Sequence, residues 1–227
     1  MVPGITRLQW RPSYRLVPSR FPPVGIYDRV ADPGDLEAVF AVENLTNPRL
    51  RQEAGEISLV LPEDRIAGPG TTPIMAAFTH LDPEGSRFSD GTYGVYYAAR
   101  SIDTAIAETR FRREQFLART KEGPIEVDMR AYLADIQGGL HDIRGRTDLP
   151  CVYDPDSYAA GQKLGRELRT VNSNGIAYDS VRHRGGQCAA VFRPTLLSNC
   201  IQGPHFCYVW DGARITTVYE KRAYTAL

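Results

Sequence analysis

The chain has 227 residues, of which 42% are hydrophobic and 24% are charged, so we expect one globular domain with its own core rather than a disordered chain. Its 27 basic and 27 acidic residues cancel, and the overall charge therefore does not favour a protein that binds duplex nucleic acid. No apolar run approaches the roughly 18 residues that a membrane-spanning helix needs. The N-terminal segment also lacks the apolar region of a secretory signal, so we expect a cytoplasmic protein.

The first half of the chain combines short elements with many turns. Residues 14–17 (YRLV) read as a strand, Asp35 can cap a helix over 36–45, and residues 57–62 (ISLVLP) could form another strand. A glycine-rich loop at 68–70 then precedes a helical segment. This loop lacks the Gly-Lys pair of a nucleoside-triphosphate P-loop, so that class of site is not supported.

The second half reads as a mixture of strands and helices. Ser101 is a good N-cap for a helix whose apolar residues recur at three- and four-residue steps. We expect strands at 94–99, 125–133, 175–181 and 188–194, helices at 101–117 and 157–171, and a C-terminal hairpin over 203–222. Because regular βαβ alternation is missing, the pattern favours the α+β class, as a single domain over 1–227 with its core in about 14–194.

The four cysteines, Cys151, Cys188, Cys200 and Cys207, form no CxxC pair and no dense framework, which is typical of reduced thiols. Cys200 and Cys207 flank His205, and the three could be imagined as zinc ligands. Their spacing matches no common zinc pattern and a fourth ligand is missing, so we expect no metal site.

One loop carries a candidate phosphate-binding arginine. Arg87 stands among small residues in the segment GSRFSDG, where a ligand can approach the backbone closely and a guanidinium can bind phosphate bidentately. The alternative is an ordinary surface arginine that pairs with Asp82 or Glu84.

Tyr96 and Tyr97 are neighbours on the predicted strand after this loop, so their side chains must point to opposite faces. We expect one to enter the core and the other to line a pocket. A tyrosine there could stack on a nicotinamide or adenine ring and also form a hydrogen bond.

Glu108 lies on the flank of the apolar face of the next helix, at the border between core and cleft. A carboxylate beside a ribose can stabilise the oxocarbenium-like charge that develops as a leaving group departs. The alternative is a solvent-facing ion pair with Arg112, one helical turn further along.

Ser180 ends a predicted strand and is followed by Arg182, His183 and Arg184. A hydroxyl beside three potentially basic groups suits a phosphate or ribose contact, and it equally suits a strand that ends in a solvated turn. No GxSxG motif surrounds Ser180, which disfavours a serine hydrolase. Arg15 in the early strand could clamp a pyrophosphate or lie exposed.

Taken together, these stretches resemble the RES-domain family, bacterial toxins named for an arginine, a glutamate and a serine. The resemblance rests on an early Tyr-Arg pair, an arginine in a GxRxx loop, a YY-type strand, a helix with Ala-x-x-Glu and a late G-I-x-Y-x-S-V-R strand. Arg87, Glu108 and Ser180 would be the name-giving residues. Many members carry G-G-R-W-N where this chain has Gly85 to Ser89, and the chain is longer than compact members around 26–77.

The resemblance implies a fold like that of the ADP-ribosyltransferase toxins, with mixed twisted sheets and flanking helices. It also implies NAD as substrate, no metal, and cleavage of the nicotinamide–ribose bond. The catalytic residues would be Arg87, Tyr97, Glu108 and Ser180, and NAD would be bound by Tyr14, Arg15, Arg87, Tyr97, Ser180 and Arg182.

The same resemblance implies that ADP-ribose is transferred to an unknown protein, with NAD hydrolysis or phosphorolysis as the alternative. It further implies an Xre/ParS-like antitoxin that occludes the site, as for ParT-like toxins, and a homodimer within that complex. We expect no direct nucleic-acid or membrane partner. A non-catalytic module that binds a nucleotide or a partner is the second alternative.

Overall fold

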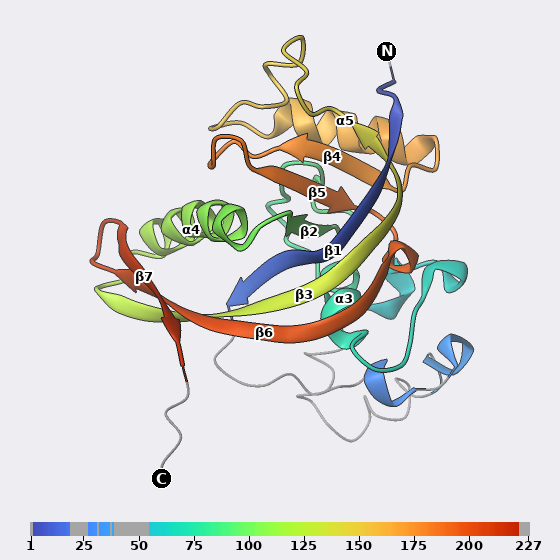
Figure 1. Ribbon diagram of the computed structural model, residues 1–227, viewed down its shortest axis with the longest axis horizontal. Coiled ribbons are helices and arrows are strands. Elements are labelled where there is room, and N and C mark those ends of the chain that lie inside the picture. The colour runs from blue at the N-terminus through green and yellow to red at the C-terminus, as the bar shows by residue number, and fades with distance from the viewer. Residues whose placement is uncertain (1, 19–26, 31, 37, 39–54, 223–227) are drawn as a thin grey trace.

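The computed structural model describes residues 2–18, 27–30, 32–36, 38 and 55–222. Its long elements are the strands β1 (Ile5–Pro18), β2 (Tyr96–Ala99), β3 (Ile125–Asp142), β4 (Gly175–Asp179), β5 (Gln187–Val191), β6 (Leu197–Trp210) and β7 (Ile215–Lys221), and the helices α3 (Thr72–Thr79), α4 (Ile102–Arg119) and α5 (Ala159–Thr170) (Figure 1). Short 3-10 helices occupy Tyr27–Arg29, Pro33–Asp35, Ile57–Leu59, Pro62–Asp64 and Pro194–Leu196. The predicted α+β class is confirmed.

The strands form one seven-stranded sheet in the order β1-β2-β5-β4-β3-β6-β7, in which β1 also pairs with β3. The pairings β1–β2–β5–β4–β3–β1 therefore close on themselves, and β6 and β7 extend the sheet as a hairpin beyond β3. All pairs are antiparallel except β3 with β4. Within this closed ring, β1 and β2 have the shortest pairing, because they share the single register pair Tyr14↔Ala99.

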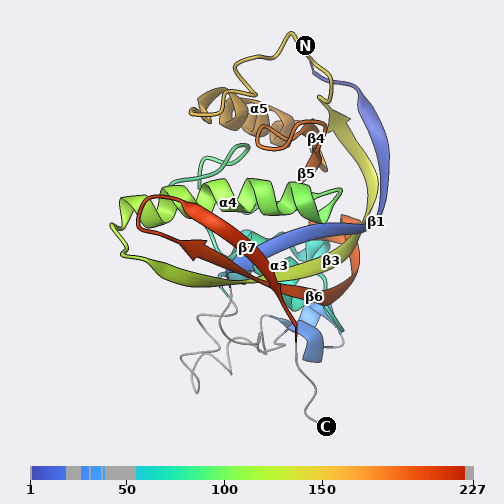
Figure 2. The same ribbon diagram turned by 60° about the vertical axis from the view of Figure 1, so that its left-hand side comes forward.

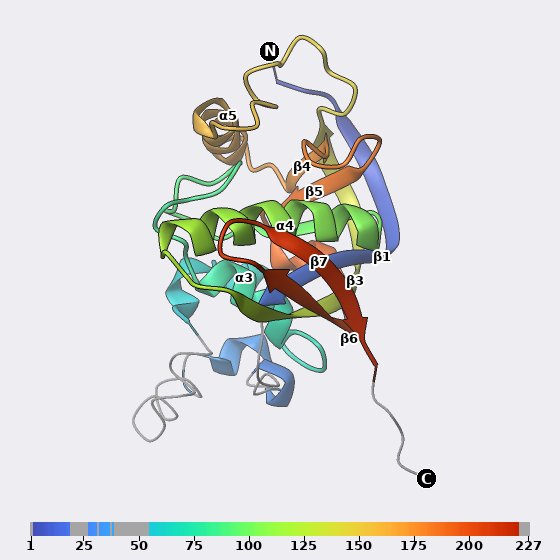
Figure 3. The same ribbon diagram turned by 90° about the vertical axis from the view of Figure 1, so that its left-hand side faces the viewer.

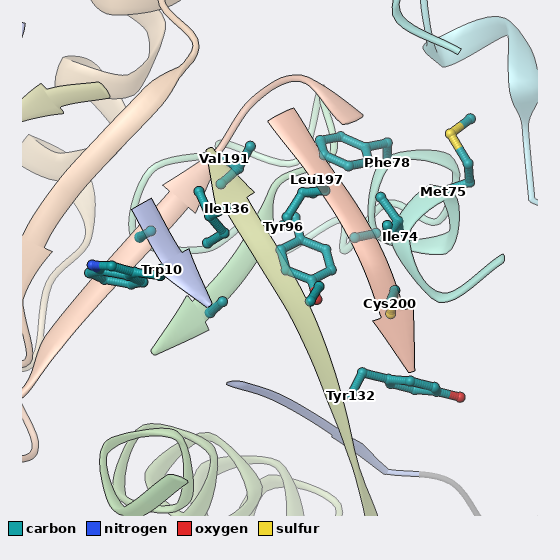
Figure 4. Packing of buried hydrophobic residues seen from close by; sticks show 14 of the residues in the cluster. Trp10, Ile74, Met75, Phe78, Tyr96, Tyr132, Ile136, Val191, Leu197 and Cys200 are labelled. Carbon is teal, nitrogen blue, oxygen red and sulfur yellow. The ribbon is translucent and has the colours of Figure 1, made fainter. Parts of the chain in front are cut away.

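Two apolar clusters cover the two faces of this sheet. One contains Tyr96 of β2 and packs under α3, whose Ile74 and Phe78 lie beside Leu197 and Cys200 of β6 (Figure 4). The other contains buried residues of α4 and α5 together with the opposite face of β3, β4 and β5. Strand residues alternate between the two clusters because successive side chains of a strand point to opposite faces.

The helix α4 lies across the molecule beside the β6–β7 hairpin (Figure 2). Ser101 caps it as predicted, since its Oγ accepts a hydrogen bond from the Thr104 N–H at 3.3 Å. The hairpin is held to α4 by the Thr109 and Tyr208 hydroxyls, 2.7 Å apart, and by the Ile215 N–H, which donates to Glu114 Oε1 at 2.8 Å. Figure 3 shows α5 on the far side of α4 from α3.

One predicted element differs from the structure. Residues 57–62 do not form a strand, because Ile57–Leu59 is a 3-10 helix followed by a single buried apolar side chain, Val60. A short apolar run cannot be assigned by periodicity alone. The helix expected over 36–45 lies largely outside the described residues. Asp32 caps the short helix at Pro33–Asp35.

The first strand is much longer than the predicted 14–17. It begins at Ile5, and a register shift between Trp10 and Ser13 interrupts its pairing with β3. Pro12 falls in this irregularity, where a missing N–H does not cost a ladder hydrogen bond. In the described residues, no helix is both long and apolar enough to span a membrane.

Candidate active site

A cavity of about 340 Å³ lies where β1 and β2 are joined by their single register pair. Its wall combines β1, α3, the loop that contains Arg87, the following strand β2, and the face of α4 that carries Glu108. The cavity therefore brings together side chains that are far apart in the sequence. The predicted residues Tyr14, Arg15, Arg87, Tyr97 and Glu108 all line it.

Arg87 is buried and held firmly at the cavity wall. Its Nη1 donates to the carbonyl oxygens of Val152 and Asp154, at 2.9 and 3.0 Å, and its guanidinium stacks over the Tyr158 ring at 4.9 Å. Within the described part of the chain, the hydrogen bonds and the ring contact of Arg87 involve no carboxylate, so its positive charge is available to an anionic ligand.

The alternative partners of Arg87 are engaged elsewhere. Asp82 pairs with Arg112 at 3.3 Å, and Glu84 pairs with Arg119. Arg87 is therefore not the surface arginine that the alternative interpretation described.

The two tyrosines of β2 diverge as predicted. Tyr96 is fully buried in the cluster under α3, while the Tyr97 ring lines the cavity. The Tyr97 hydroxyl accepts a hydrogen bond from the Phe88 N–H at 2.9 Å and lies 2.7 Å from Ser86 Oγ. Burial raises its pKa, so the phenol stays neutral. Tyr97 thus fixes the two residues on either side of Arg87.

Glu108 and Ser180 meet, although 72 positions separate them in the chain. Ser180 Oγ donates to Glu108 Oε1 at 2.6 Å and accepts from the backbone N–H groups of Arg182 and His183 at 3.2 and 2.9 Å. The hydroxyl proton therefore orients the carboxylate at the cavity wall. Among the described residues no hydrogen bond reaches Glu108 Oε2, and this oxygen remains for a ligand.

Arg15 crosses from β1 to β2. Its Nη1 donates to the Tyr97 carbonyl oxygen at 3.1 Å, and its guanidinium lies 4.8 Å from the centre of the Tyr96 ring. Its buried Nε has no hydrogen-bond partner among the residues that the structure describes. Burial lowers its pKa from the ordinary arginine value. A buried donor without a partner is costly.

Arg182 and Ser180 do not belong to the cavity lining. The Arg182 guanidinium stacks over the Phe111 ring at 3.2 Å and also donates to the Pro155 carbonyl oxygen. Ser180 reaches the cavity through Glu108. The binding role of Arg182 stays a prediction, and its observed contacts point to fixing the loop after Ser180.

Several lining residues were not identified from the sequence. Tyr158 stacks on Arg87, Ser86 contacts Tyr97, and Arg112 and Arg113 follow Glu108 on the cavity face of α4. Arg112 could have been found from its spacing of four residues after Glu108, which places it on the same helix face. Tyr158 could not, because only the tertiary fold brings it to Arg87.

The family model of the RES domain matches residues 62–211, well over half of the chain. A relative from Sinorhizobium fredii (strain NBRC 101917 / NGR234), described as the uncharacterized protein y4oC, is 37% identical over 207 residues and covers 91% of this chain and 86% of its own. Among solved structures, the M. tuberculosis MbcT–MbcA toxin–antitoxin complex gives a TM-score of 0.46 at 12% identity, covering 87% of this chain and 86% of that one. The chain belongs to the RES domain family.

Proposed function

We propose that this chain is the toxin of a bacterial toxin–antitoxin pair and that it cleaves the nicotinamide–ribose bond of NAD. The observation that carries the proposal is the Glu108 carboxylate, held by Ser180 at the wall of a cavity that also exposes Arg87 and Tyr97. Its role as a toxin rests on membership of the RES domain family.

In the proposed reaction, the bond between the ribose C1′ and the nicotinamide nitrogen breaks, and its electron pair leaves with nicotinamide. Positive charge then develops on C1′ and the ring oxygen. Glu108 stabilises this charge electrostatically, in the way that carboxylates act in glycosidases. Ser180 acts through Glu108 as a positioning residue, because its proton points at Oε1.

The other predicted residues have binding roles in this proposal. Arg15 and Arg87 contact the phosphates as fixed cations, while the Tyr97 ring packs against the nicotinamide ribose. No group in this scheme has to move a proton before nicotinamide departs, since the leaving group departs neutral.

The acceptor of ADP-ribose is a protein side chain in our proposal, with water or phosphate as the alternative. Labelled NAD added to a cell lysate with the purified protein separates the two. Label on a protein band supports transfer, whereas free ADP-ribose or its phosphate supports NAD degradation. The proposed partner is an Xre/ParS-like antitoxin that covers the cavity.

Brief induced expression tests the proposal in cells. The wild type should arrest growth or lower cellular NAD, and Glu108→Gln should do neither while remaining folded. Glu167→Gln is the matched control, because Glu167 is an exposed residue of α5 that pairs only with Lys163 at 3.9 Å among the described residues. A wild type that changes neither growth nor NAD would favour the non-catalytic module.

A further inference from the structure

The loop that follows Ser180 contacts α4 at two points one helical turn apart. Ser180 Oγ donates to Glu108 Oε1, and the His183 ring places its Nδ1 2.8 Å from the hydroxyl of Thr104, an almost fully buried residue. Because Thr104 and Glu108 are four residues apart, they lie on the same face of the helix. The loop therefore runs along this face, and Thr104 anchors it one turn before Glu108.

Thr104 is itself fixed from both sides. Its N–H donates to Oγ of the N-cap residue Ser101 at 3.3 Å, and the hydroxyls of the two residues lie 2.9 Å apart. On the loop side, a Cβ at Gly186 would lie only 2.6 Å from Thr104 Oγ1. The loop also closes on itself here, since the Ser180 N–H donates to the Gly186 carbonyl oxygen at 2.8 Å and the Gly186 N–H donates to that of His183 at 2.9 Å. The first turn of α4 thus determines where the backbone of His183 lies.

The position of this backbone determines where the Ser180 proton points. A hydroxyl can donate one hydrogen bond and accept two. Ser180 Oγ accepts from the N–H groups of Arg182 and His183, at 3.2 and 2.9 Å, so both acceptor positions are used and the proton is left for Glu108. If the His183 backbone moved, one acceptor position would open and the hydroxyl could turn away from the carboxylate.

We propose that His183 is a positioning residue for Glu108 that acts through Ser180. Its ring, anchored at Thr104, holds its own N–H against the Ser180 oxygen. The inference rests on the proposed function, since it concerns how the same carboxylate is oriented. Neither His183 nor Thr104 is among the described residues that line the cavity, so the pair acts on the orientation of Glu108 rather than on the binding of NAD.

Steady-state kinetics of nicotinamide release by the full chain tests this role. Thr104→Val removes the anchoring hydroxyl with little change in volume, whereas Thr104→Ser keeps it. Thr104→Val is also combined with Glu108→Gln. The matched control is Thr216→Val, at an exposed position of β7. Hydrogen exchange of the His183 amide, followed by NMR, is a second measurement that needs no turnover, and circular dichroism confirms that each variant is folded.

Thr104→Val should lower kcat by about tenfold, the loss that corresponds to one hydrogen bond between neutral groups. Its KM for NAD should change by less than about twofold, because an interaction that orients a catalytic group acts on kcat rather than on binding. Thr104→Ser should retain the wild-type kcat. In the Glu108→Gln background Thr104→Val should cause no further loss, since residues that act as a unit are not additive. His183→Ala should reproduce the loss in kcat, and it decides the test if Thr104→Val does not fold.

The His183 amide should exchange at least about fivefold faster in Thr104→Val than in the wild type, and at the wild-type rate in Thr216→Val. An equal loss of kcat with and without Glu108 would overturn the proposal, because His183 would then not act through that carboxylate. Unaltered kcat and unaltered exchange in Thr104→Val would also overturn it, while leaving the proposed function standing. Faster exchange in Thr104→Val, with no nicotinamide release by the wild type, would support the anchor and overturn the proposed function.

Discussion

At the scale of single residues, the adjacent tyrosines of β2 show how position decides what a hydroxyl contributes. The Tyr97 hydroxyl has two partners in the loop around Arg87, whereas the fully buried Tyr96 hydroxyl has none in the described ranges of the chain. A buried polar group without a partner is a cost, and a satisfied one stabilises the structure.

The two Tyr→Phe substitutions should therefore have different effects on the free energy of unfolding. Tyr97→Phe leaves the Phe88 N–H without its acceptor and should lower the free energy of unfolding by about 1–3 kcal/mol. Tyr96→Phe removes an unpaired hydroxyl and should be neutral or slightly stabilising. Urea denaturation measures both. Equal losses in the two variants would contradict the assigned hydrogen bonds.

The residues of the candidate site differ in how far the sequence could predict them. Arg87, Tyr97 and Glu108 follow one another along a loop, a strand and a helix, where local patterns marked each as a candidate beside an ordinary structural alternative, and the resemblance joined them in one site. Ser180 required the resemblance, because its contact with Glu108 spans 72 positions. Arg113 was missed since a charged helix residue usually indicates a solvated face.

At the scale of elements, α5 owes its position to two glycines. A Cβ at Gly161 would lie 2.2 Å from the Arg87 carbonyl oxygen, and one at Gly165 would lie 2.1 Å from the Phe88 carbonyl oxygen. The helix can therefore pack directly against the backbone of the loop that carries Arg87. The Gly-x-x-x-Gly spacing was visible in the sequence, but the element it contacts was not.

Gly161→Ala should consequently destabilise the protein. In a solvent-exposed helix, by contrast, replacing glycine with alanine stabilises the helix by up to about 1 kcal/mol. Overpacking against the loop should cost about 1–3 kcal/mol and displace Arg87, so NAD turnover should fall as well. Thermal unfolding and an activity assay measure the two effects. Lys163→Ala, at an exposed position of α5, should change neither, and a stabilised Gly161→Ala would refute the close contact.

Among the elements, those with a local signal were predicted and those set by long-range pairing were not. The helices α4 and α5 and the strands β2, β4 and β5 lie where capping and alternation indicated. The N-terminal half of β1 was not predicted, although Leu8 and Trp10 alternate with polar residues. Its stability comes from pairing with β3, more than a hundred positions away.

At the scale of the whole molecule, the closed ring of strands brings the cavity walls together. Near the end of β3, Asp142 joins three parts of that ring. Its N–H donates to the Gly4 carbonyl oxygen at 2.8 Å, and its carboxylate binds Arg144 through both oxygens. Arg144 in turn donates to Gln187 of β5 at 3.2 Å.

Asp142→Asn should therefore destabilise the fold in a pH-dependent way. The hydrogen bonds from Arg144 lower the pKa of Asp142 in the folded state, so the stabilisation is fully present above the unfolded value of about 3.9 and is lost as pH falls through the folded pKa. The variant should be about 1 kcal/mol less stable at pH 7, and the difference should shrink below about pH 4. Unfolding followed from pH 7 to pH 3 measures this. A stability difference that grows in acid would contradict the assigned hydrogen bonds between Asp142 and Arg144. The control is Asp148→Asn, in an exposed pair with Arg146, which should show a smaller stability difference.

The most direct test of the central claim is the release of nicotinamide from NAD by the purified protein, with wild type and Glu108→Gln compared side by side. We predict that the wild type releases nicotinamide and that the substitution slows this step by about a hundredfold to a thousandfold, the usual loss when one charge-stabilising group is removed. Both proteins should be folded and should bind NAD. Equal release by the two proteins, or none above the uncatalysed rate by the wild type, would contradict the assignment of Glu108 and the proposed function with it.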